Sequence, residues 1–531
     1  MNNKLYRLSI SILPSLIFIA LAVFLLKNSF SYSDPDLGWH LRIGQDIALS
    51  RQAPVINNYN YTLSGQSWVD HEWLLNWLLA LIFNYGGFLS LHLIFVFLAL
   101  AAFFIAWRRS WRLLGGTLAD KFLSCLFLFF GIWASLPHLG IRVQEVGLLG
   151  LSVLFLIFSD FSRYRRYFWG LPVMFLIWAN VHGSFLLGLV LVGAYFIYSL
   201  LSPWLARRSW SQVFLQTVFL KKDQWHLGLI FCLSLAATLI NPYGLGLYAF
   251  LSGYTHTFYL NYIQEWRNQF VFPLHYAQLI YLAVAAAGLF LFGQKKFDYK
   301  IKFSLWDWGL FLFFFFLALK SRRHFPIFVL VSLPILTGAF REDLILLWRC
   351  WSYRSRAILT VWTALAAFLF ICLQTAFLPW KQDGIKSFCN ISYPCAAVVY
   401  LQAHPETKNW RLFNEYSWGG FLLWAYPEKQ LFIDGRMPQV LYRGHTIFEE
   451  YLNFRRFGDK PAQKLEENKI NLVLISSQNH NLHLRAWEKI FFQITDDELA
   501  APDYLRQYLD GSPDWQLAFK DKFSLIYTRK Q

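Results

Sequence analysis

The chain of 531 residues is 56% hydrophobic and 20% aromatic, and only 15% of its residues are charged. A soluble protein of this length is about one quarter charged, so the composition excludes an ordinary soluble enzyme. Residues 1–378 hold 29 Lys or Arg against 14 Asp or Glu, whereas residues 379–531 hold 19 against 18. The net charge of +16 does not require a nucleic-acid partner, because most of the excess lies in short loops between apolar stretches.

Apolar stretches of about 20 residues recur up to position 378, and each is long enough to cross a membrane. The first follows Lys4 and Arg7, but no small-residue cleavage site comes after it, so we interpret it as a retained helix. These features predict an α-helical polytopic membrane protein with about eleven transmembrane helices. The expected spans are 8–27, 88–107, 121–136, 143–159, 167–181, 184–202, 225–241, 277–293, 304–319, 325–340 and 357–378.

Positive charges in the loops predict the orientation. With the N-terminus inside, each inside loop has three or four Lys or Arg residues, while the outside loops are poor in them. An odd number of spans then places the tail outside, so we expect a multi-pass protein of the bacterial cytoplasmic membrane with an extracytoplasmic C-terminal domain. The inside charges are Arg108, Arg109, Arg112, Lys121, Arg163, Arg165, Arg166, Arg207, Arg208, Lys221, Lys222, Lys295, Lys296, Lys300, Lys302, Arg341, Arg349, Arg354 and Arg356.

Residues 30–87 form a long first outer loop. Within it, 38–50 is too polar and 71–85 too short for a span, but both are periodic and rich in Trp. Helices that lie in the membrane interface fit these properties.

The tail, 379–531, has the pattern of an α/β domain. Cys389 and Cys395 are close in sequence and lie in an oxidising compartment if the orientation holds, so we predict a disulfide between them. The expected strands are 421–426, 430–434, 471–476 and a hairpin over 515–528, and the expected helices are 446–457, 460–468 and 482–490.

Polar residues gather at the outer ends of the predicted spans. Ionisable groups bordering a span are costly unless they are paired or used, so each is a candidate functional residue. Carboxylates can take a proton from an acceptor hydroxyl, and arginines can neutralise a phosphate leaving group. The set therefore indicates a site for a phospholipid-linked substrate. Its members are Asp34, Asp36, His71, Glu72, Arg142, Glu145, His182, Asn241, Glu265, Arg322 and Arg323.

Several of these residues also have a purely structural interpretation. Asp34 and Asp36 can cap the helix that follows them. His182 can form an interhelical hydrogen bond, and Arg322 and Arg323 can bind ordinary lipid headgroups. Arg142 and Glu265 can form an ion pair with each other. The functional prediction therefore depends on the convergence of these groups at one membrane face and not on any single motif.

This arrangement resembles the GT-C superfamily of integral-membrane glycosyltransferases. The superfamily includes protein O-mannosyltransferases, aminoarabinose transferases of lipid A and catalytic subunits of oligosaccharyltransferases. The similarity covers most of 1–378 and is greatest to a bacterial subgroup. It rests on Asp34-Pro35-Asp36, Trp39-His40-Leu41, His71-Glu72-Trp73, Trp178-Ala179-Asn180-Val181-His182-Gly183, Asn241-Pro242-Tyr243-Gly244 and Glu265-Trp266, with Trp418-Gly419-Gly420 and Ile433-Asp434-Gly435-Arg436 in the tail.

The resemblance implies an inverting transfer of a sugar from a polyprenyl-phosphate-linked donor to an envelope glycan, glycolipid or protein. Asp34 or Asp36 would be the general base, with Asp36 favoured, and Arg322 and Arg323 would hold the donor phosphate. The tail segment 416–420 lacks the Asp of the oligosaccharyltransferase Trp-Trp-Asp-Tyr-Gly signature, which argues against transfer of whole glycans to asparagine.

A divalent metal is used by some members of the superfamily and not by others. Ligands for one could come from Asp34, Asp36, Glu145 and His182.

Two other functions are alternatives to a glycosyltransferase. A transporter or flippase of a lipid-linked substrate predicts polar residues along the bilayer, but the middles of the spans are nearly free of charge, and Asp307 lies near an inner end. A non-catalytic membrane scaffold would keep the same architecture without activity. Loss of activity in an Asp36→Asn variant would distinguish an enzyme from a scaffold.

Overall fold

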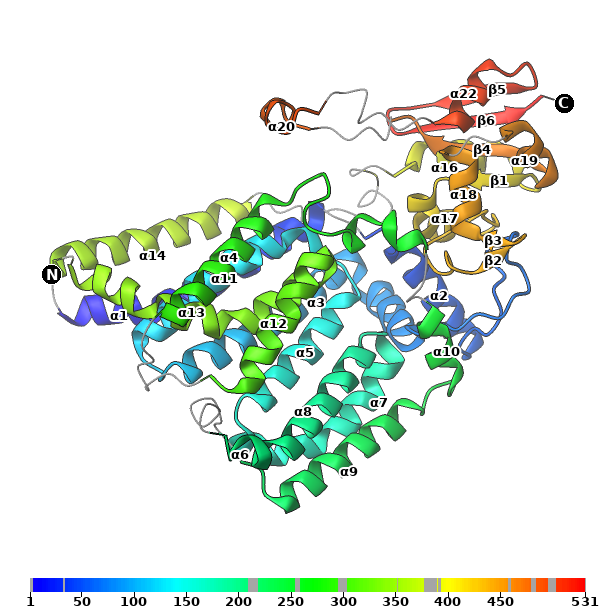
Figure 1. Ribbon diagram of the computed structural model, residues 1–531. Coiled ribbons are helices and arrows are strands. Elements are labelled where there is room, and N and C mark those ends of the chain that lie inside the picture. Colours follow the sequence, from blue (N-terminus) through cyan, green and yellow to red (C-terminus); the bar gives the residue numbers. More distant parts are fainter. Residues whose placement is uncertain are drawn as a thin grey trace.

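The computed structural model is a mostly helical chain with a small sheet near the C-terminus (Figure 1). The structure describes residues 3–31, 34–208, 218–253, 258–294, 303–350, 352–376, 389, 393–456, 460–478, 484–494 and 503–530.

Each of the expected spans falls on a helix, which confirms the polytopic helical fold. These helices are α1 (Asn3–Ser31), α3 (Trp73–Leu113), α4 (Leu118–Ser135), α5 (Gln144–Phe158), α7 (Leu171–Val181), α8 (Phe185–Leu205), α9 (Lys221–Thr238), α11 (Tyr276–Gln294), α12 (Leu305–Lys320), α13 (Phe325–Cys350) and α14 (Tyr353–Ala376). Shorter elements between them are α2 (Leu37–Ser50), α6 (Phe161–Tyr164), α10 (Gly246–Ser252) and the 3-10 turns η1 (Leu136–His138), η2 (Arg165–Gly170), η5 (Phe258–Asn261), η6 (Gln264–Trp266) and η7 (Arg322–His324).

These helices differ in length and in apolar composition, and therefore in whether they can cross a membrane. Within the described residues, five helices are long and apolar enough to cross a membrane, and α5 together with Phe161–Val181, bent by 112°, would make a sixth. The five are Trp73–Leu113, Ala119–His138, Phe185–Leu205, Tyr276–Gly293 and Arg322–Leu347. The chain is thus a multi-pass membrane protein, while several predicted spans are shorter than expected. Helix α7 has 11 residues, because the expected span 167–181 begins as the 3-10 turn η2.

Ion pairs occupy the ends of the helices where the inside charges were expected. Arg109 on α3 contacts Asp307 on α12 at 2.7 Å, and both side chains are buried. Arg341 likewise contacts Asp120 at 2.6 Å. Asp307 is therefore held in an ion pair and in a capping box with Ser304. Lys295, Lys296, Lys300 and Lys302, with the side chains of Arg349, Arg354 and Arg356, lie outside the described part.

The first outer loop contains both of the predicted short helical segments. Helix α2 occupies the first, and the second opens the 41-residue element α3 from Trp73 up to a kink at Gly87, where φ is 62° and ψ is −159°. The kink separates this segment from the predicted span that begins at residue 88, because Gly87 leaves the helical conformation there.

The C-terminal domain is built on a four-stranded mixed sheet of order β1-β4-β6-β5. Strand β1 runs parallel to β4, and β6 pairs antiparallel with both β4 and β5. The strands are β1 (Arg411–Asn414), β4 (Ile470–Ser476), β5 (Trp515–Lys520) and β6 (Ser524–Arg529), and a separate hairpin has β2 (Leu441–Tyr442) and β3 (His445–Thr446). The helices are α16 (Cys395–Ala403), α17 (Gly419–Ala425), α18 (Ile447–Arg455), α19 (Pro461–Glu467), α20 (Ala486–Phe492) and α22 (Tyr504–Gly511), with 3-10 turns η8 (Pro405–Thr407) and η9 (Tyr416–Trp418).

Two of the predicted strands are wrong. Residues 421–425 lie in helix α17, and 430–434 forms an isolated bridge, between Leu431 and Asn60, in place of a strand. A short apolar run buried on all sides has no periodicity that separates strand from helix. The strands expected at 471–476 and 515–528 coincide with β4 and with the β5–β6 hairpin.

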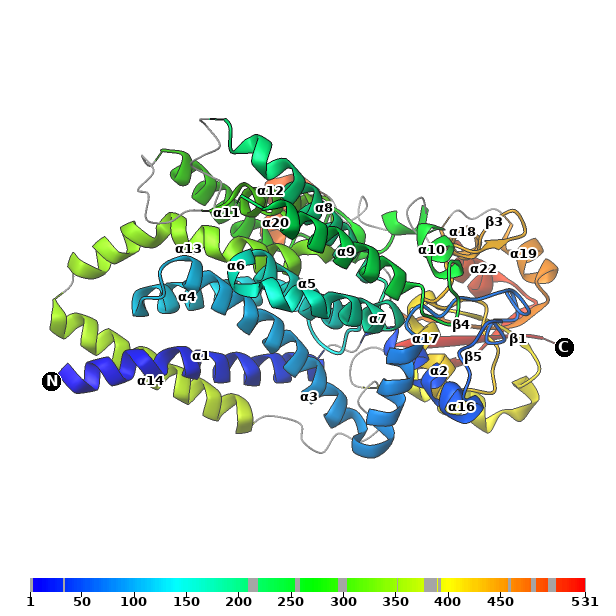
Figure 2. The same cartoon turned by 90° about the horizontal axis from the view of Figure 1, so that it is seen from below.

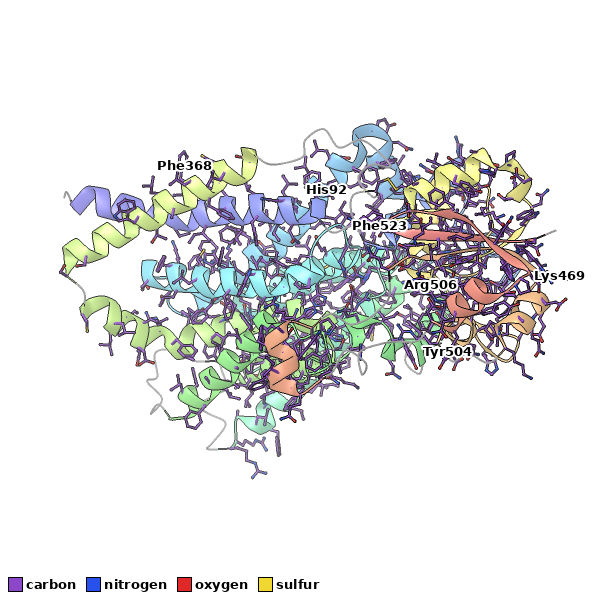
Figure 3. The ribbon with its side chains drawn as sticks, turned by 90° about the horizontal axis from the view of Figure 1, so that it is seen from above. His92, Phe368, Lys469, Tyr504, Arg506 and Phe523 are labelled. Atoms are coloured by element: carbon purple, nitrogen blue, oxygen red, sulfur yellow. A yellow bond between two sulfur atoms is a disulfide. The ribbon has the colours of Figure 1, made fainter. Side chains whose placement is uncertain are left out.

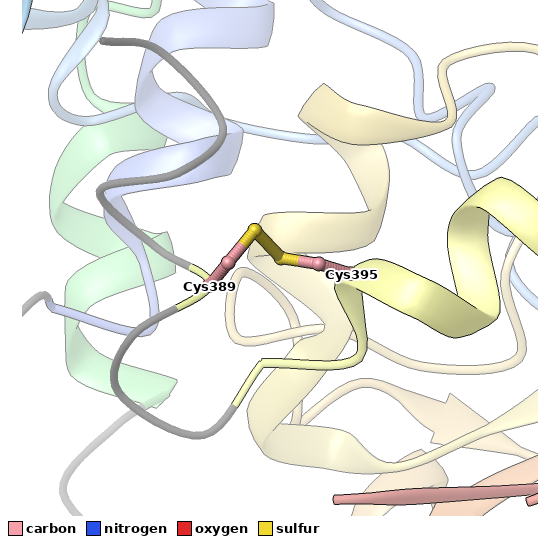
Figure 4. Close-up of a disulfide and its surroundings, with 2 residues drawn as sticks. All are labelled: Cys389 and Cys395. Carbon is pink, nitrogen blue, oxygen red and sulfur yellow. A yellow bond between two sulfur atoms is a disulfide. The ribbon is translucent and has the colours of Figure 1, made fainter. Parts of the chain in front are cut away.

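A disulfide joins Cys389 to Cys395, the first residue of α16 (Figure 4). The domain boundary expected after residue 378 lies in 377–388, outside the described residues.

The C-terminal domain contacts the helical region through close backbone packing of α17 on α2 (Figure 2). A Cβ at Gly38 would lie 2.2 Å from the carbonyl oxygen of Gly420, and a Cβ at Gly420 would lie 2.2 Å from that of Pro35. Only glycine fits at these two positions without displacing backbone. The contact places the domain directly over the Asp34-Pro35-Asp36 turn.

Candidate functional site

The Asp34–Asp36 turn lies between α1 and α2. Oδ1 of Asp34 accepts a hydrogen bond from the backbone N–H of Asp36 at 2.9 Å, so this carboxylate shapes the turn. Asp36 occupies the N-cap position of α2, but its carboxylate makes no side-chain cap hydrogen bond within the described residues. Helix capping therefore does not explain the Asp36 carboxylate.

Asp36 lies against the C-terminal domain. A Cβ at Gly435 would lie 2.2 Å from Oδ1 of Asp36, so the carboxylate touches the backbone between Asp434 and Arg436. Burial raises the pKa of Asp36 to about 7, and the charges of Asp34 and Asp434 act in the same direction. A carboxyl group with this pKa is poised to exchange a proton near neutral pH.

Two partly exposed arginines flank the carboxylates. Nε of Arg142 lies 3.9 Å from Oδ2 of Asp34, and the same guanidinium forms a close ion pair with Glu265. Nη1 of Arg323 lies 3.8 Å from Oε2 of Glu265, and its guanidinium is 4.8 Å from the centre of the Trp266 ring. Glu265 thus joins two cations that come from different helix ends. Arg142 and Glu265 form the mutual ion pair of the structural interpretation, and this pair is part of a larger charged group that includes Arg323 and Asp34.

A second group forms around Glu72 at the start of α3. Its Oε1 is 3.5 Å from Nε2 of His71 and 3.5 Å from Nε2 of His182, and its Oε2 is 3.9 Å from Nδ1 of His40. Burial lowers the pKa of His71 to about 3 and that of His40 to about 4. Burial also raises the pKa of Glu72 above its usual range, with Asp70 and Asp36 adding to the effect. The histidines are therefore neutral at physiological pH.

Hydrogen bonds fix the orientation of two of these histidines. The amide nitrogen of Asn76 donates to both oxygens of Asp70, at 3.0 and 2.8 Å, so its Oδ1 accepts from Nδ1 of His40 at 2.6 Å. Nδ1 of His182 accepts from the backbone N–H of Ser184 at 3.1 Å. The proton of neutral His182 is then on Nε2, which faces Glu72.

Three predicted site residues make local contacts instead. Arg322 is fully buried, and its guanidinium donates to the carbonyl of Val271. Oε1 of Glu145 accepts from the backbone N–H of Gly140 at 2.9 Å. Asn241 closes the turn after α9, where its Nδ2 donates to the carbonyl of Thr238 at 2.8 Å. These contacts hold turns at the helix ends.

The C-terminal domain contributes a pair that received no role in the sequence analysis. Nε and Nη2 of Arg436 donate to the two oxygens of Asp434, at 2.9 and 2.7 Å. Nη2 also donates to Oδ1 of Asn60 at 2.7 Å, and the guanidinium lies 4.5 Å from the Tyr59 ring centre. The pair ties the Gly435 turn to the first outer loop. The signal was an Asp-Gly-Arg sequence inside an otherwise uncharged stretch.

A metal site does not fit the predicted ligands. Among the residues that the structure describes, no group of three or more His, Cys, Asp or Glu is arranged to hold a metal ion. Glu145 is bonded to Gly140, and His182 faces Glu72. The four residues Asp34, Asp36, Glu145 and His182 therefore do not form one ligand set.

Comparison with known proteins shows similarity in structure only. No protein-family profile matches the sequence, and no curated protein sequence matches it. The archaeal oligosaccharyltransferase AglB from Archaeoglobus fulgidus, solved with an inhibitory peptide and a dolichol-phosphate, is 12% identical. Its TM-score is 0.51 over 86% of this chain and 68% of that one.

Two further structures are similar. The arabinofuranosyltransferase AftD from Mycobacteria is 13% identical, with a TM-score of 0.50 over 100% of this chain and 40% of that one. ArnT from Cupriavidus metallidurans, bound to undecaprenyl phosphate, is 12% identical, with a TM-score of 0.48 over 97% of both chains. The chain therefore has the GT-C fold of polytopic membrane glycosyltransferases, and the resemblance inferred from its motifs is confirmed at the level of the fold.

Proposed function

We propose that this protein is a GT-C glycosyltransferase that moves a sugar from a polyprenyl-phosphate-linked donor to an envelope glycan, glycolipid or protein. The observation that carries the proposal is the position of the Asp36 carboxylate, which lies against the Gly435 turn, beside Asp34 and near Arg323. Its pKa, raised to about 7, suits a general base. Base and phosphate ligand are both needed for such a transfer, and both lie at one end of the helical region.

In this mechanism the ionised Asp36 takes the proton of the acceptor hydroxyl. The acceptor oxygen attacks the anomeric carbon from the face opposite the phosphate, and the bond from that carbon to the phosphate oxygen breaks with its electron pair. The product sugar is inverted, and the polyprenyl phosphate leaves as an anion. Asp34, held by the backbone of Asp36 and by Arg142, positions the base.

Arg323 is the residue to which we assign the leaving phosphate. Its side chain is partly exposed, and its charge acts on Asp36, whereas Arg322 is buried against Val271. Arg142 and Arg323 both contact the Glu265 carboxylate, so Arg142 adds a second positive charge beside Arg323. Both arginines were expected to hold the donor phosphate. We therefore propose that Arg323 contacts the phosphate and that Arg322 supports the η7 turn.

Native mass spectrometry of gently purified protein tests the donor class. We expect a polyprenyl phosphate, or its sugar conjugate, on the wild type and a loss of that lipid in Arg323→Ala. Arg42→Ala is the matched control, because Arg42 is a partly exposed arginine on α2 that pairs with Asp46 at 3.1 Å. Bulk phospholipid alone on all three proteins would reject the proposed donor.

A further inference from the structure

Helix α20 belongs to the C-terminal domain in sequence but lies over the spanning helices. In Figures 1 and 3 it lies apart from the sheet and above the green helices of the membrane region. Tyr276 donates a hydrogen bond to Glu488, and the Phe272 and Phe492 ring centres are 4.9 Å apart. Tyr276 is the first residue of span α11. Helix α20 is therefore fixed at the end of the membrane region that faces the C-terminal domain.

One face of α20 is apolar and open. Trp487, Ile490 and Phe491 follow the i, i+3, i+4 spacing of a single helix face. Ile490 and Phe491 are 79% and 74% exposed, and Trp487, which is 48% exposed, has its ring centre 5.3 Å from that of Tyr276. Glu488 is buried and faces Tyr276. A soluble surface seldom leaves side chains this large and apolar in water. The face therefore needs an apolar or interfacial partner.

We propose that α20 is an interfacial membrane anchor whose Trp487, Ile490 and Phe491 insert among the phospholipids of the adjacent leaflet. Lipid is the occupant because α20 contacts the first turn of a spanning helix, where the lateral neighbours are headgroups and acyl chains. Trp and Phe are the side chains that settle at this depth. Arg485 and Lys489, at either side of Glu488, add positive charge for lipid phosphates.

The anchor gives the C-terminal domain an attachment to the membrane region away from its contacts with α2 and the first outer loop. Those contacts include the packing of Gly420 on Gly38 and the hydrogen bond of Arg436 with Asn60. Helix α20 lies over the helical region at a distance from the sheet (Figure 3). Attachment at this second place restricts rocking of the domain about the first. This role does not depend on the proposed sugar transfer.

Photocrosslinking in nanodiscs of phosphatidylcholine and phosphatidylglycerol tests the anchor. The full-length protein carries p-benzoylphenylalanine in place of Phe491, or in place of Ile490 so that the result does not depend on one side chain. Leu517, which is 48% exposed on β5 of the sheet, is the matched control position. After illumination, mass spectrometry identifies the adducts.

We expect phospholipid adducts at positions 490 and 491 and no phospholipid adduct at the control position 517. Adducts to a second copy of the chain at 490 and 491, or lipid adducts no stronger than at 517, would overturn the proposal. The readout needs neither donor nor activity, so its failure leaves the glycosyltransferase proposal standing.

Discussion

At the scale of single residues, the chemistry depends on how the fold crowds carboxylates together. Asp36 lies beside Asp34 and against the Asp434–Arg436 turn, which comes from a part of the chain about 400 positions away. Burial and the two neighbouring charges disfavour its ionised form and raise its pKa into the neutral range. A sequence can place two carboxylates in one turn, but it does not show which one lies against a distant domain.

The activity should depend on pH through Asp36. Because the base acts ionised and its pKa is raised to about 7, kcat/KM should rise as pH increases through that value. The substitution Asp34→Asn removes the negative charge beside Asp36, so the pKa of Asp36 should fall. The acidic limb of the pH profile should then move to lower pH. The pH profile of kcat/KM measures this. Asp46→Asn, on the neighbouring helix α2, should leave the limb in place. An unmoved limb in Asp34→Asn would contradict this role of Asp34.

Gly435 should tolerate no side chain. An added Cβ would lie 2.2 Å from Oδ1 of Asp36 and would displace the base. We expect Gly435→Ala to lower kcat by roughly 100-fold, since a misplacement of about 1 Å has that effect. Gly511→Ala is the control, because a Cβ there would meet no atom within 4 Å. Equal turnover numbers for the two variants would show that the contact is unimportant.

At the scale of elements, the sequence predicts the spanning helices better than the tail. A long apolar run has one structural solution in lipid, which is why all the expected spans are helical. Short runs such as 421–426 are decided by packing against α2, which no local pattern reveals. The same limit applies to the site. Position at a helix end identifies Arg322 and Arg323 equally, but the turn η7 buries Arg322 and leaves Arg323 partly exposed.

The link between Arg436 and Asp434 should hold the Gly435 turn in place. Arg436→Ala leaves Asp434 buried without its cation, which should destabilise the domain by about 3–5 kcal/mol. Limited proteolysis of the purified protein should show faster cleavage within the C-terminal domain. Arg443→Ala removes an exposed pair with Glu467 and should change the rate little. Similar rates for both variants would argue against the clamp.

At the scale of the whole molecule, the sheet domain covers one end of the helical region, and the candidate site lies in the contact between them (Figure 1). We propose that this end faces away from the cytoplasm. The supporting features are the loop cations of the opposite end and the Cys389–Cys395 disulfide, which is typical of an oxidising compartment.

Reporter fusions test this orientation. Alkaline phosphatase needs an oxidising compartment, so a fusion after Gln531 should be active, whereas a fusion after Arg208 should be inactive. Enzyme activity normalised to the amount of fusion protein is the measurement. The opposite result would place the site in the cytoplasm and exclude the proposed donor face.

The proposed function depends most on Asp36 acting as the base of a sugar transfer from a lipid phosphate. The most direct measurement is release of polyprenyl phosphate from the donor that co-purifies with the wild type, in proteoliposomes of wild type, Asp36→Asn and Asp46→Asn. We expect turnover by wild type and Asp46→Asn, and a loss of roughly 10²- to 10⁴-fold in Asp36→Asn with the donor still bound. Turnover by Asp36→Asn at the rate of the control would contradict this role of Asp36.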